Sequence, residues 1–265
     1  MINLLKADFY RIKKNKSFQI CFLVSFVCIG LLAFILNGIA QENLGQELSS
    51  ASTLLVDAMM GSLLASLVIG SYVCGDFESK TIHDEIACGE GRLSVVITKM
   101  ISCMIAVAII ILPYAIVSLV CFFAEIEMAP LAGIPSVFVN IMCNATGAEV
   151  TGSTIGKSIV LCIVALIVYM ARLSLCVPLA FKMRMPVVVM SFGIVTSFGF
   201  DILSQAVKDI PVISTIAENT PFSLIYELTM DASVGTILKV LLISVLFIVL
   251  VTWFTYILFR KTDIK

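Results

Sequence analysis

The sequence has few charged residues. Lysine, arginine, aspartate and glutamate make up 13% of its 265 residues, whereas hydrophobic residues make up 60%. Ordinary soluble domains carry about 25% charged residues, because their surface must face water. This composition excludes a soluble globular domain and is typical of an integral membrane protein.

Histidine is almost absent too. His83 is the single histidine, and no two of the nine cysteines are spaced as Cys-x-x-Cys. An intramembrane metalloprotease needs clustered His and Glu ligands, and a serine protease needs a histidine base inside the membrane. We therefore expect no metal site and no catalytic residues. Most cysteines lie in or beside apolar runs, where they are expected to pack as small apolar side chains.

A complete phosphate-binding loop is also missing. The stretch Gly152–Ser158 resembles one, but the motif Gly-x-x-x-x-Gly-Lys-Ser/Thr requires a glycine where this chain has Thr151. We therefore expect no cofactor in this chain and no ATP hydrolysis by it.

Long apolar runs are abundant. A helix crosses a bilayer with about 20 residues, and six segments reach that length: Ser17–Leu36, Leu54–Gly75, Val95–Phe123, Ile155–Phe181, Pro186–Gln205 and Thr236–Phe259. The pattern predicts an all-α integral membrane fold with six transmembrane helices, as a single transmembrane domain over residues 1–265. The first run is longer than the apolar part of a signal peptide, so we expect an uncleaved helix.

The basic residues predict the orientation, because lysine and arginine gather on the cytoplasmic side of a membrane. Most of the 17 lie in the N-terminal segment, the second and fourth connections and the C-terminal tail. We therefore expect a multi-pass protein of the cell membrane with both termini in the cytoplasm. The outer connections 124–154 and 206–235 each contain an apolar stretch too short or too broken to span, which predicts interfacial or re-entrant helices.

Residues 1–16 form a separate element. Apolar Ile2, Leu5, Phe9 and Ile12 recur at helical spacing among basic residues. This pattern predicts an amphipathic helix over 2–14 that lies in the headgroup plane. Its expected membrane anchors are Lys6, Phe9, Arg11, Lys13 and Lys14.

The second cytoplasmic connection, residues 76–91, is the most charged inner one. Phe77, Ile82 and Ile86 recur at helical spacing, and glycines at 89 and 91 supply a stop. The pattern predicts a short amphipathic helix with Glu78, Asp84 and Glu85 facing water or a partner protein. Such a helix fits a groove on another protein.

Here the chain resembles the permease subunits of type-2 ABC exporters, of the bacterial peptide and antibiotic export and immunity kind. The resemblance rests on the acidic residue after the second span, on a Thr-Ile pair, and on a later glycine, arginine and lysine: Asp76 or Glu78, Thr81-Ile82, Gly89, Arg92 and Lys99. The run Leu4–Arg11 is similar to the elbow helix of the same family. Lys80 departs from it, since members commonly have glycine before the Thr-Ile pair.

The resemblance implies several partners. They are two copies of a cytoplasmic ABC ATPase that hold ATP and Mg²⁺, a second permease subunit (identical or homologous), membrane lipid, and a hydrophobic or amphipathic cargo such as a peptide; no nucleic acid is expected. The ATPase would dock on the coupling helix at 76–91. The residues expected at that surface are Asp76, Glu78, Thr81, Ile82, His83, Glu85, Ile86 and Arg92.

Three charges lie inside or close to the spans. Arg172 is expected near mid-membrane, where an ionisable side chain is costly and indicates function. It either pairs with Asp57 or Asp201 along a polar transport path, or its stem extends toward the inner headgroups. A gradient-driven secondary transporter is the alternative function, and it predicts coupling-ion sites at broken helices and inverted repeats. Small residues in spans two and five, Ser66 and Gly193 among them, permit close helix packing within or between subunits.

Overall fold

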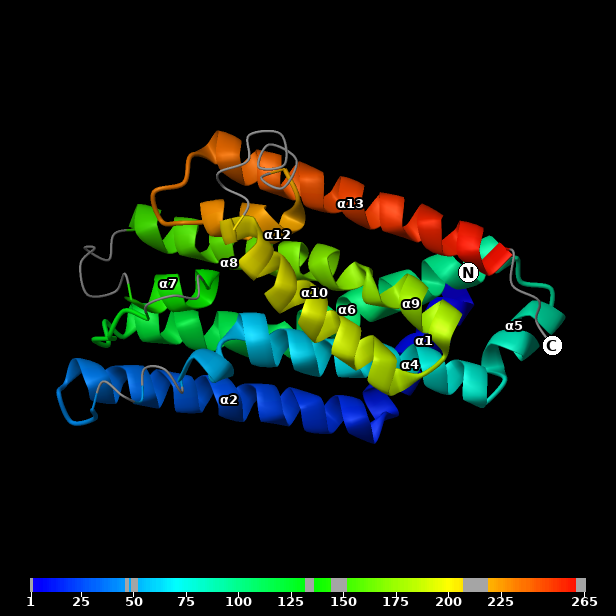
Figure 1. Ribbon diagram of the computed structural model, residues 1–265, viewed down its shortest axis with the longest axis horizontal. Coiled ribbons are helices and arrows are strands. Elements are labelled where there is room, and N and C mark those ends of the chain that lie inside the picture. The colour runs from blue at the N-terminus through cyan, green and yellow to red at the C-terminus, as the bar shows by residue number, and fades with distance from the viewer. Residues whose placement is uncertain are drawn as a thin grey trace.

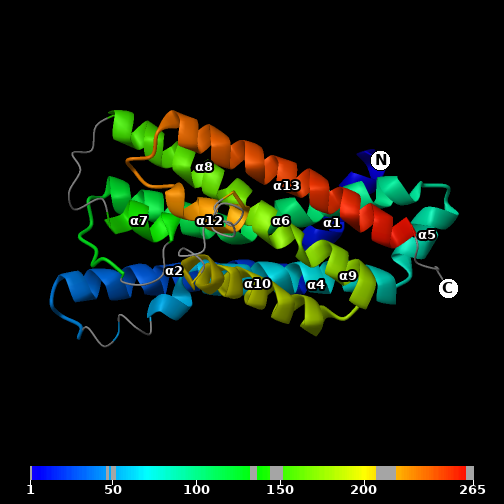
Figure 2. The same cartoon turned by 45° about the horizontal axis from the view of Figure 1, so that its top comes forward.

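The computed structural model describes residues 2–45, 48, 52–131, 136–143, 152–206 and 219–260, with the side chains of 2, 198 and 201–206 not described. Every regular element in these ranges is a helix, and they contain no strand. The long helices lie side by side in one elongated bundle (Figures 1 and 2). The prediction of an all-helical membrane fold is confirmed at this level.

Five helical segments in the described part of the chain are long and apolar enough to cross a membrane. They are α2 (Lys16–Ala40), the segment Asp57–Glu78 that includes α4 (Ser62–Glu78), α6 (Arg92–Phe123), α8 and α9 together (Gly152–Ser174 and Cys176–Met183), and α13 (Val234–Arg260). Each begins and ends within a few residues of a predicted span. Helix α10 (Pro186–Ala206) occupies the remaining predicted span, but its apolar part with described side chains, Pro186–Ser197, is shorter than a bilayer crossing.

Short helices cover the two ends of the bundle. Helix α1 (Ile2–Lys14), helix α5 (Thr81–Ala87) and the last turns of α13 lie at one end, which we call the α5 end (Figure 1). Helix α7 (Val137–Cys143) and helix α12 (Pro221–Leu224), with the 3₁₀ turn η4 (Ile225–Glu227), lie toward the opposite end, the α7 end. The predicted helix over 2–14 is therefore present.

Local sequence explains where several helices begin and end. The Asn15 side chain accepts a hydrogen bond of 2.9 Å from the Ser17 backbone N–H, which caps α2 and separates it from α1. Pro186 opens α10, where a missing N–H costs nothing. Lys80 and Arg184 have φ of 57° and 54°, and these left-handed residues turn the chain after α4 and after α9.

Two predicted spans are broken where we expected continuous helices. The second begins with a 3₁₀ turn, η1 (Thr53–Leu55), and a π-helix, η2 (Asp57–Gly61), before α4 starts. The fourth is interrupted at Leu175, between α8 and α9. The helix expected over 76–91 is also shorter, because α4 continues to Glu78 and α5 covers only seven residues.

Helices α4 and α10 approach each other closely. A Cβ built on Gly193 would lie 2.3 Å from the Cβ of Ser66, so only glycine fits there. The Ser66 hydroxyl of α4 is 3.4 Å from the Met190 carbonyl of α10. These two small residues therefore serve packing within the chain, which was one of the two predicted uses.

Seven of the cysteines are buried among apolar side chains, as predicted: Cys21, Cys28, Cys74, Cys103, Cys121, Cys162 and Cys176. Gly152–Ser158 forms the start of α8 rather than a phosphate-binding loop.

Candidate functional site

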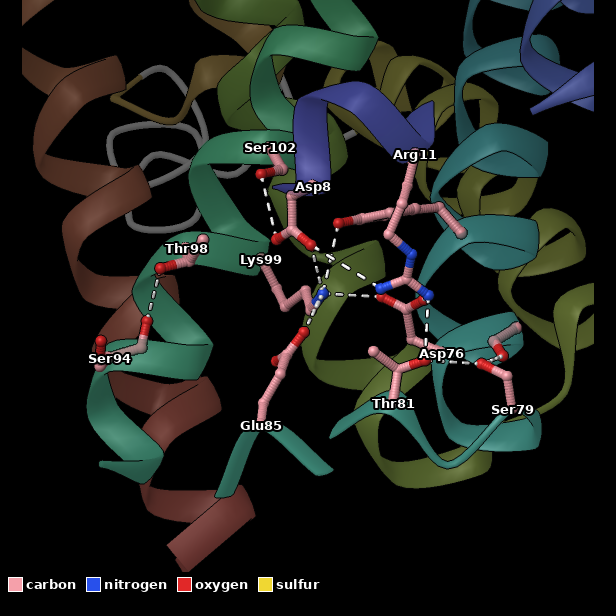
Figure 3. Close-up of polar contacts among 12 residues, drawn as sticks. Asp8, Arg11, Asp76, Ser79, Thr81, Glu85, Ser94, Thr98, Lys99 and Ser102 are labelled. Carbon is pink, nitrogen blue, oxygen red and sulfur yellow. Dashed lines mark hydrogen bonds and ion pairs between the residues drawn. The ribbon is translucent and has the colours of Figure 1, made fainter. Parts of the chain in front are cut away.

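Lys99 is the centre of a buried charge cluster at the α5 end (Figure 3). Its side chain, on α6, is fully buried. The ammonium Nζ lies 2.7 Å from Oδ1 of Asp8 on α1, 2.7 Å from Oδ2 of Asp76 on α4 and 3.1 Å from Oε1 of Glu85 on α5. One ammonium group thus connects four helices.

Arg11 provides the second cation of the cluster. Its Nη2 donates to the Asp76 carboxylate, and also to the Thr81 hydroxyl at 3.0 Å. Asp76 therefore lies between Arg11 and Lys99, and its Oδ2 meets Lys99 as an ion pair rather than as an aligned hydrogen bond. Lys99 and Arg11 therefore each connect α1, α4 and α5.

The cluster contains more carboxyl groups than cations. It joins three carboxylates to two cations, and Oε2 of Glu85 is buried without a hydrogen-bond partner among the described residues. Burial raises the pKa of the Glu85 carboxyl above its usual value, against the opposing effect of the Lys99 ammonium. The negative charges of Asp8 and Asp76 raise this pKa further.

This arrangement corrects part of the predicted docking surface. We expected Glu85 to face water or a partner, but it lies under α5 against Lys99, and Ile82 is fully buried beside it. Residues three and four apart share one face of a helix, so this face of α5 is the one that attaches it to the bundle. Asp76 is buried and Thr81 accepts from Arg11, so these two also belong to the attachment.

Arg92, another predicted docking residue, contacts the end of α13. Its Nη1 donates to the Arg260 carbonyl at 3.0 Å, and its guanidinium carbon lies 5.9 Å from the centre of the Phe259 ring. Arg92 therefore binds the C-terminal end of α13, and its side chain is partly exposed.

The outer surface of α5, together with Glu78 at the end of α4, remains for docking. Glu78 and Asp84 are exposed, and His83 and Ile86 are partly exposed. Three of these four were predicted docking residues, and Asp84 was predicted to face water or a partner. A surface with two acids and one apolar side chain is thus held at the tip of the bundle by the cluster beneath it.

Most of the predicted membrane anchors are exposed, and one is bound within the chain. Lys6, Lys13 and Lys14 are exposed on α1, and Phe9 is partly buried. Arg11 is the exception, since Asp76 and Thr81 bind its guanidinium.

A second polar centre lies toward the α7 end. Asp57, the first residue of the π-helix, is fully buried and accepts hydrogen bonds from the hydroxyls of Ser136 and Tyr169. The Ser136 hydroxyl also caps α7 by accepting from the Val139 N–H at 3.2 Å. Single-turn π-helices occur often at functional sites.

Arg172 adjoins this centre through Tyr169. Its guanidinium carbon lies 5.7 Å from the Tyr169 ring centre and 5.3 Å from that of Phe222, and its Nη2 donates to the Ser197 carbonyl at 3.0 Å. Arg172 is 1% exposed, and these contacts hold its guanidinium inside the bundle. The Asp201 side chain lies outside the described residues.

Sequence reasoning did not include Asp8 and Lys99 among the site residues. The sequence nevertheless marks both, because each places a charge on a helical face that is otherwise apolar or small. Asp8 shares its face with Leu5 and Ile12. Lys99 shares its face with Val95, Val96 and Cys103. Such a charge calls for a partner of opposite sign. In the described part of the chain, no group of histidine, cysteine, aspartate and glutamate side chains could hold a metal ion.

No protein-family model matches the chain, and no curated protein sequence matches it.

Proposed function

We propose that this chain is the membrane-spanning permease subunit of an ATP-driven exporter of the type-2 ABC kind, with ATP and Mg²⁺ on a separate ATPase. The observation that carries the proposal is α5, a short helix at the tip of the bundle. Its inner face is fastened to α1, α4 and α6 through Lys99, while its outer face remains accessible. A push on such a helix reaches three other helices without passing through a flexible loop.

The proposal includes a topology and a cargo. Helix α10 is the sixth span, α1 lies in the headgroup plane as the elbow helix, and the α5 end is in the cytoplasm of a bacterial cell. A second permease subunit completes the path. The cargo is hydrophobic or amphipathic, such as a peptide, and it moves out of the cell or membrane.

Co-purification tests the proposal. The chain is extracted gently from its native membrane, and ATP hydrolysis is measured on the eluate. We expect a stoichiometric ATPase with the unaltered chain, and its loss when Glu78→Lys and Asp84→Lys are combined, because both side chains are exposed on the docking surface. The matched control combines Glu127→Lys and Asp231→Lys, two exposed acids at the α7 end; it should retain the ATPase.

Two results would overturn the proposal. If the chain is isolated without an ATPase, even after crosslinking in the membrane, the proposed exporter function is refuted. If both double variants retain the ATPase equally, an ATPase partner exists but α5 is not its docking site.

One observation favours a gradient-driven secondary transporter as the second candidate. Asp57 is a fully buried carboxylate at a broken helix, and coupling-ion sites in such transporters are built on broken helices. Transport in vesicles driven by an imposed pH gradient without ATP, and abolished by Asp57→Asn, would support this candidate against the exporter.

A further inference from the structure

An apolar groove lies between α1, α2 and α6 at the α5 end. It consists of two adjoining hollows of about 280 Å³ and 440 Å³ that share Lys13, Phe18 and Ile109. Phe9 closes the groove on the α1 side, and Phe22 and Phe26 continue it along α2. Lys13 supplies the only charged side chain among the residues that line these two hollows.

The groove has the length of one membrane leaflet. It follows α2 from Phe18 to Val27, and at 1.5 Å per residue this stretch is about 14 Å long. Half of the hydrocarbon thickness of a bilayer is about 15 Å. Since Leu23, Phe26 and Val27 are at least half exposed on a candidate spanning helix, the groove opens toward lipid rather than water.

The mouth of the groove is cationic. Lys13 lines it, Lys6 and Lys14 are exposed elsewhere on α1, and Lys16 is exposed at the start of α2. No described carboxylate lies within 4.0 Å of any of their amino groups. The Nζ of Lys14 lies 4.9 Å from the centre of the Tyr10 ring. Arg11, by contrast, is neutralised by Asp76. Of these lysines, Lys13 places an unpaired positive charge in the lining of the groove.

We propose that this groove binds one anionic phospholipid, with its phosphate at Lys13 and one acyl chain between α1, α2 and α6. An apolar trough of leaflet length with a cation at the headgroup level matches such a molecule in shape, depth and charge. The inference rests on the proposed position of α1 in the headgroup plane, and it does not depend on the ATPase partner.

The structure offers an internal comparison. A hollow of about 660 Å³ on α13 is lined only by aliphatic side chains, Leu238, Leu241, Leu242, Val245, Leu246 and Val249. That hollow can accept an acyl chain but has no cation in its lining. Any selectivity for lipid charge should therefore belong to the groove at α1 and not to the hollow on α13.

Native mass spectrometry of the full chain tests the site. The chain is purified in neutral detergent and titrated with dioleoyl phosphatidylglycerol or with dioleoyl phosphatidylcholine. We expect one phosphatidylglycerol to be retained in preference to phosphatidylcholine. Lys13→Gln should weaken its retention about fivefold, the effect of one lysine near an anionic surface. Ile109→Trp should abolish it by filling the groove, with Lys13 left in place.

Matched variants separate a built site from general attraction. Lys239→Gln removes an exposed lysine at the α7 end, and Leu242→Trp fills the hollow on α13; both should leave retention unchanged. Thermal unfolding in detergent without lipid checks that Ile109→Trp folds. If it does not, Phe22→Ala, which removes an exposed wall of the groove, should lower retention in its place.

Three results would overturn the proposal. One is equal retention of the two lipids. Another is a loss with Lys239→Gln as large as that with Lys13→Gln, which would indicate diffuse attraction. The third is complete displacement by soluble glycerol 3-phosphate, which would show that the headgroup alone is bound and that the groove takes no acyl chain.

Discussion

The Nζ of Lys99 lies 2.7 Å from Oδ1 of Asp8, although the two residues are 91 positions apart in the chain. Both side chains are buried, at 0% and 1% exposure. A buried charge that loses its partner is strongly destabilising, because it keeps the cost of desolvation without the compensating attraction. The junction of α1 with α6 therefore depends on this pair.

Lys99→Met should lower the free energy of unfolding by about 3–5 kcal/mol, since three carboxylates then lose their shared cation. The measurement is thermal unfolding of the detergent-solubilised chain, followed by circular dichroism. Adding Asp8→Asn to Lys99→Met should recover part of the loss, because it removes one of the stranded charges. Lys239→Met, at an exposed position, should leave the midpoint unchanged. An unaltered midpoint with Lys99→Met would contradict the role assigned to the cluster.

The stability of the α5 end should depend on Glu85 and on pH. Burial raises the pKa of the Glu85 carboxyl in the folded protein above the usual 4.5, with Lys99 opposing and with Asp8 and Asp76 adding to the rise. The folded state then binds more protons than the unfolded state between the two pKa values. Stability contributed by this group therefore falls as pH rises through the window that opens near 4.5.

Glu85→Gln should flatten that dependence. The amide oxygen can still accept from Lys99, but the group no longer ionises. As pH rises above 4.5, the unfolding midpoint should fall less in this variant than in the unaltered chain. Asp84→Asn, which removes the neighbouring exposed acid, is the control and should keep the full slope. Identical slopes for Glu85→Gln and the unaltered chain would show that Glu85 does not hold the proton.

Gly193→Ala should separate α10 from α4. The added Cβ would lie 2.3 Å from the Ser66 Cβ and 3.2 Å from the Cys176 Sγ, which requires a backbone shift and should cost about 1–3 kcal/mol. Gly199→Ala is the matched control on the same helix, because its Cβ meets nothing closer than 4.0 Å. Thermal unfolding of the two variants gives the comparison, and equal midpoints would refute the close packing.

Arg172→Lys should destabilise the chain although it conserves the charge. The arginine carbon Cζ lies between the rings of Tyr169 and Phe222, and a lysine ammonium lacks the planar group that stacks on them. The expected loss is about 1–2 kcal/mol in unfolding free energy. Arg260→Lys, at an exposed position, should have no such effect. If Arg172→Lys is as stable as the unaltered chain, the ring contacts contribute nothing.

Much of the fold could be predicted from apolar run length. The span predicted at Val95–Phe123 is α6, Arg92–Phe123, and the first and last spans agree as closely. The breaks could not be predicted in this way. The π-helix at Asp57 is accompanied by hydrogen bonds from Ser136 and Tyr169, which come from distant segments, and hydropathy along one segment contains no information about them.

The site was harder to predict for a related reason. An acid on a short charged helix is expected to face water, and Glu85 does not, because Lys99 approaches it from another helix. The same applies to Arg11, which was interpreted as a membrane anchor but binds Asp76. Whether a charged side chain faces solvent or forms a buried ion pair depends on which cation and carboxylate meet in space. The amphipathic pattern predicts only that the segment is helical.

The first turns of α6 bind both ends of the described chain. Lys99 binds Asp8 of α1, and two turns earlier Arg92 donates to the Arg260 carbonyl at the end of α13. During translation, Asp8 is made well before Lys99, so it has no ammonium partner until α6 follows. The carbonyl of Arg260 is made long after Arg92. Helix α6 thus contacts both a helix made before it and a helix made after it.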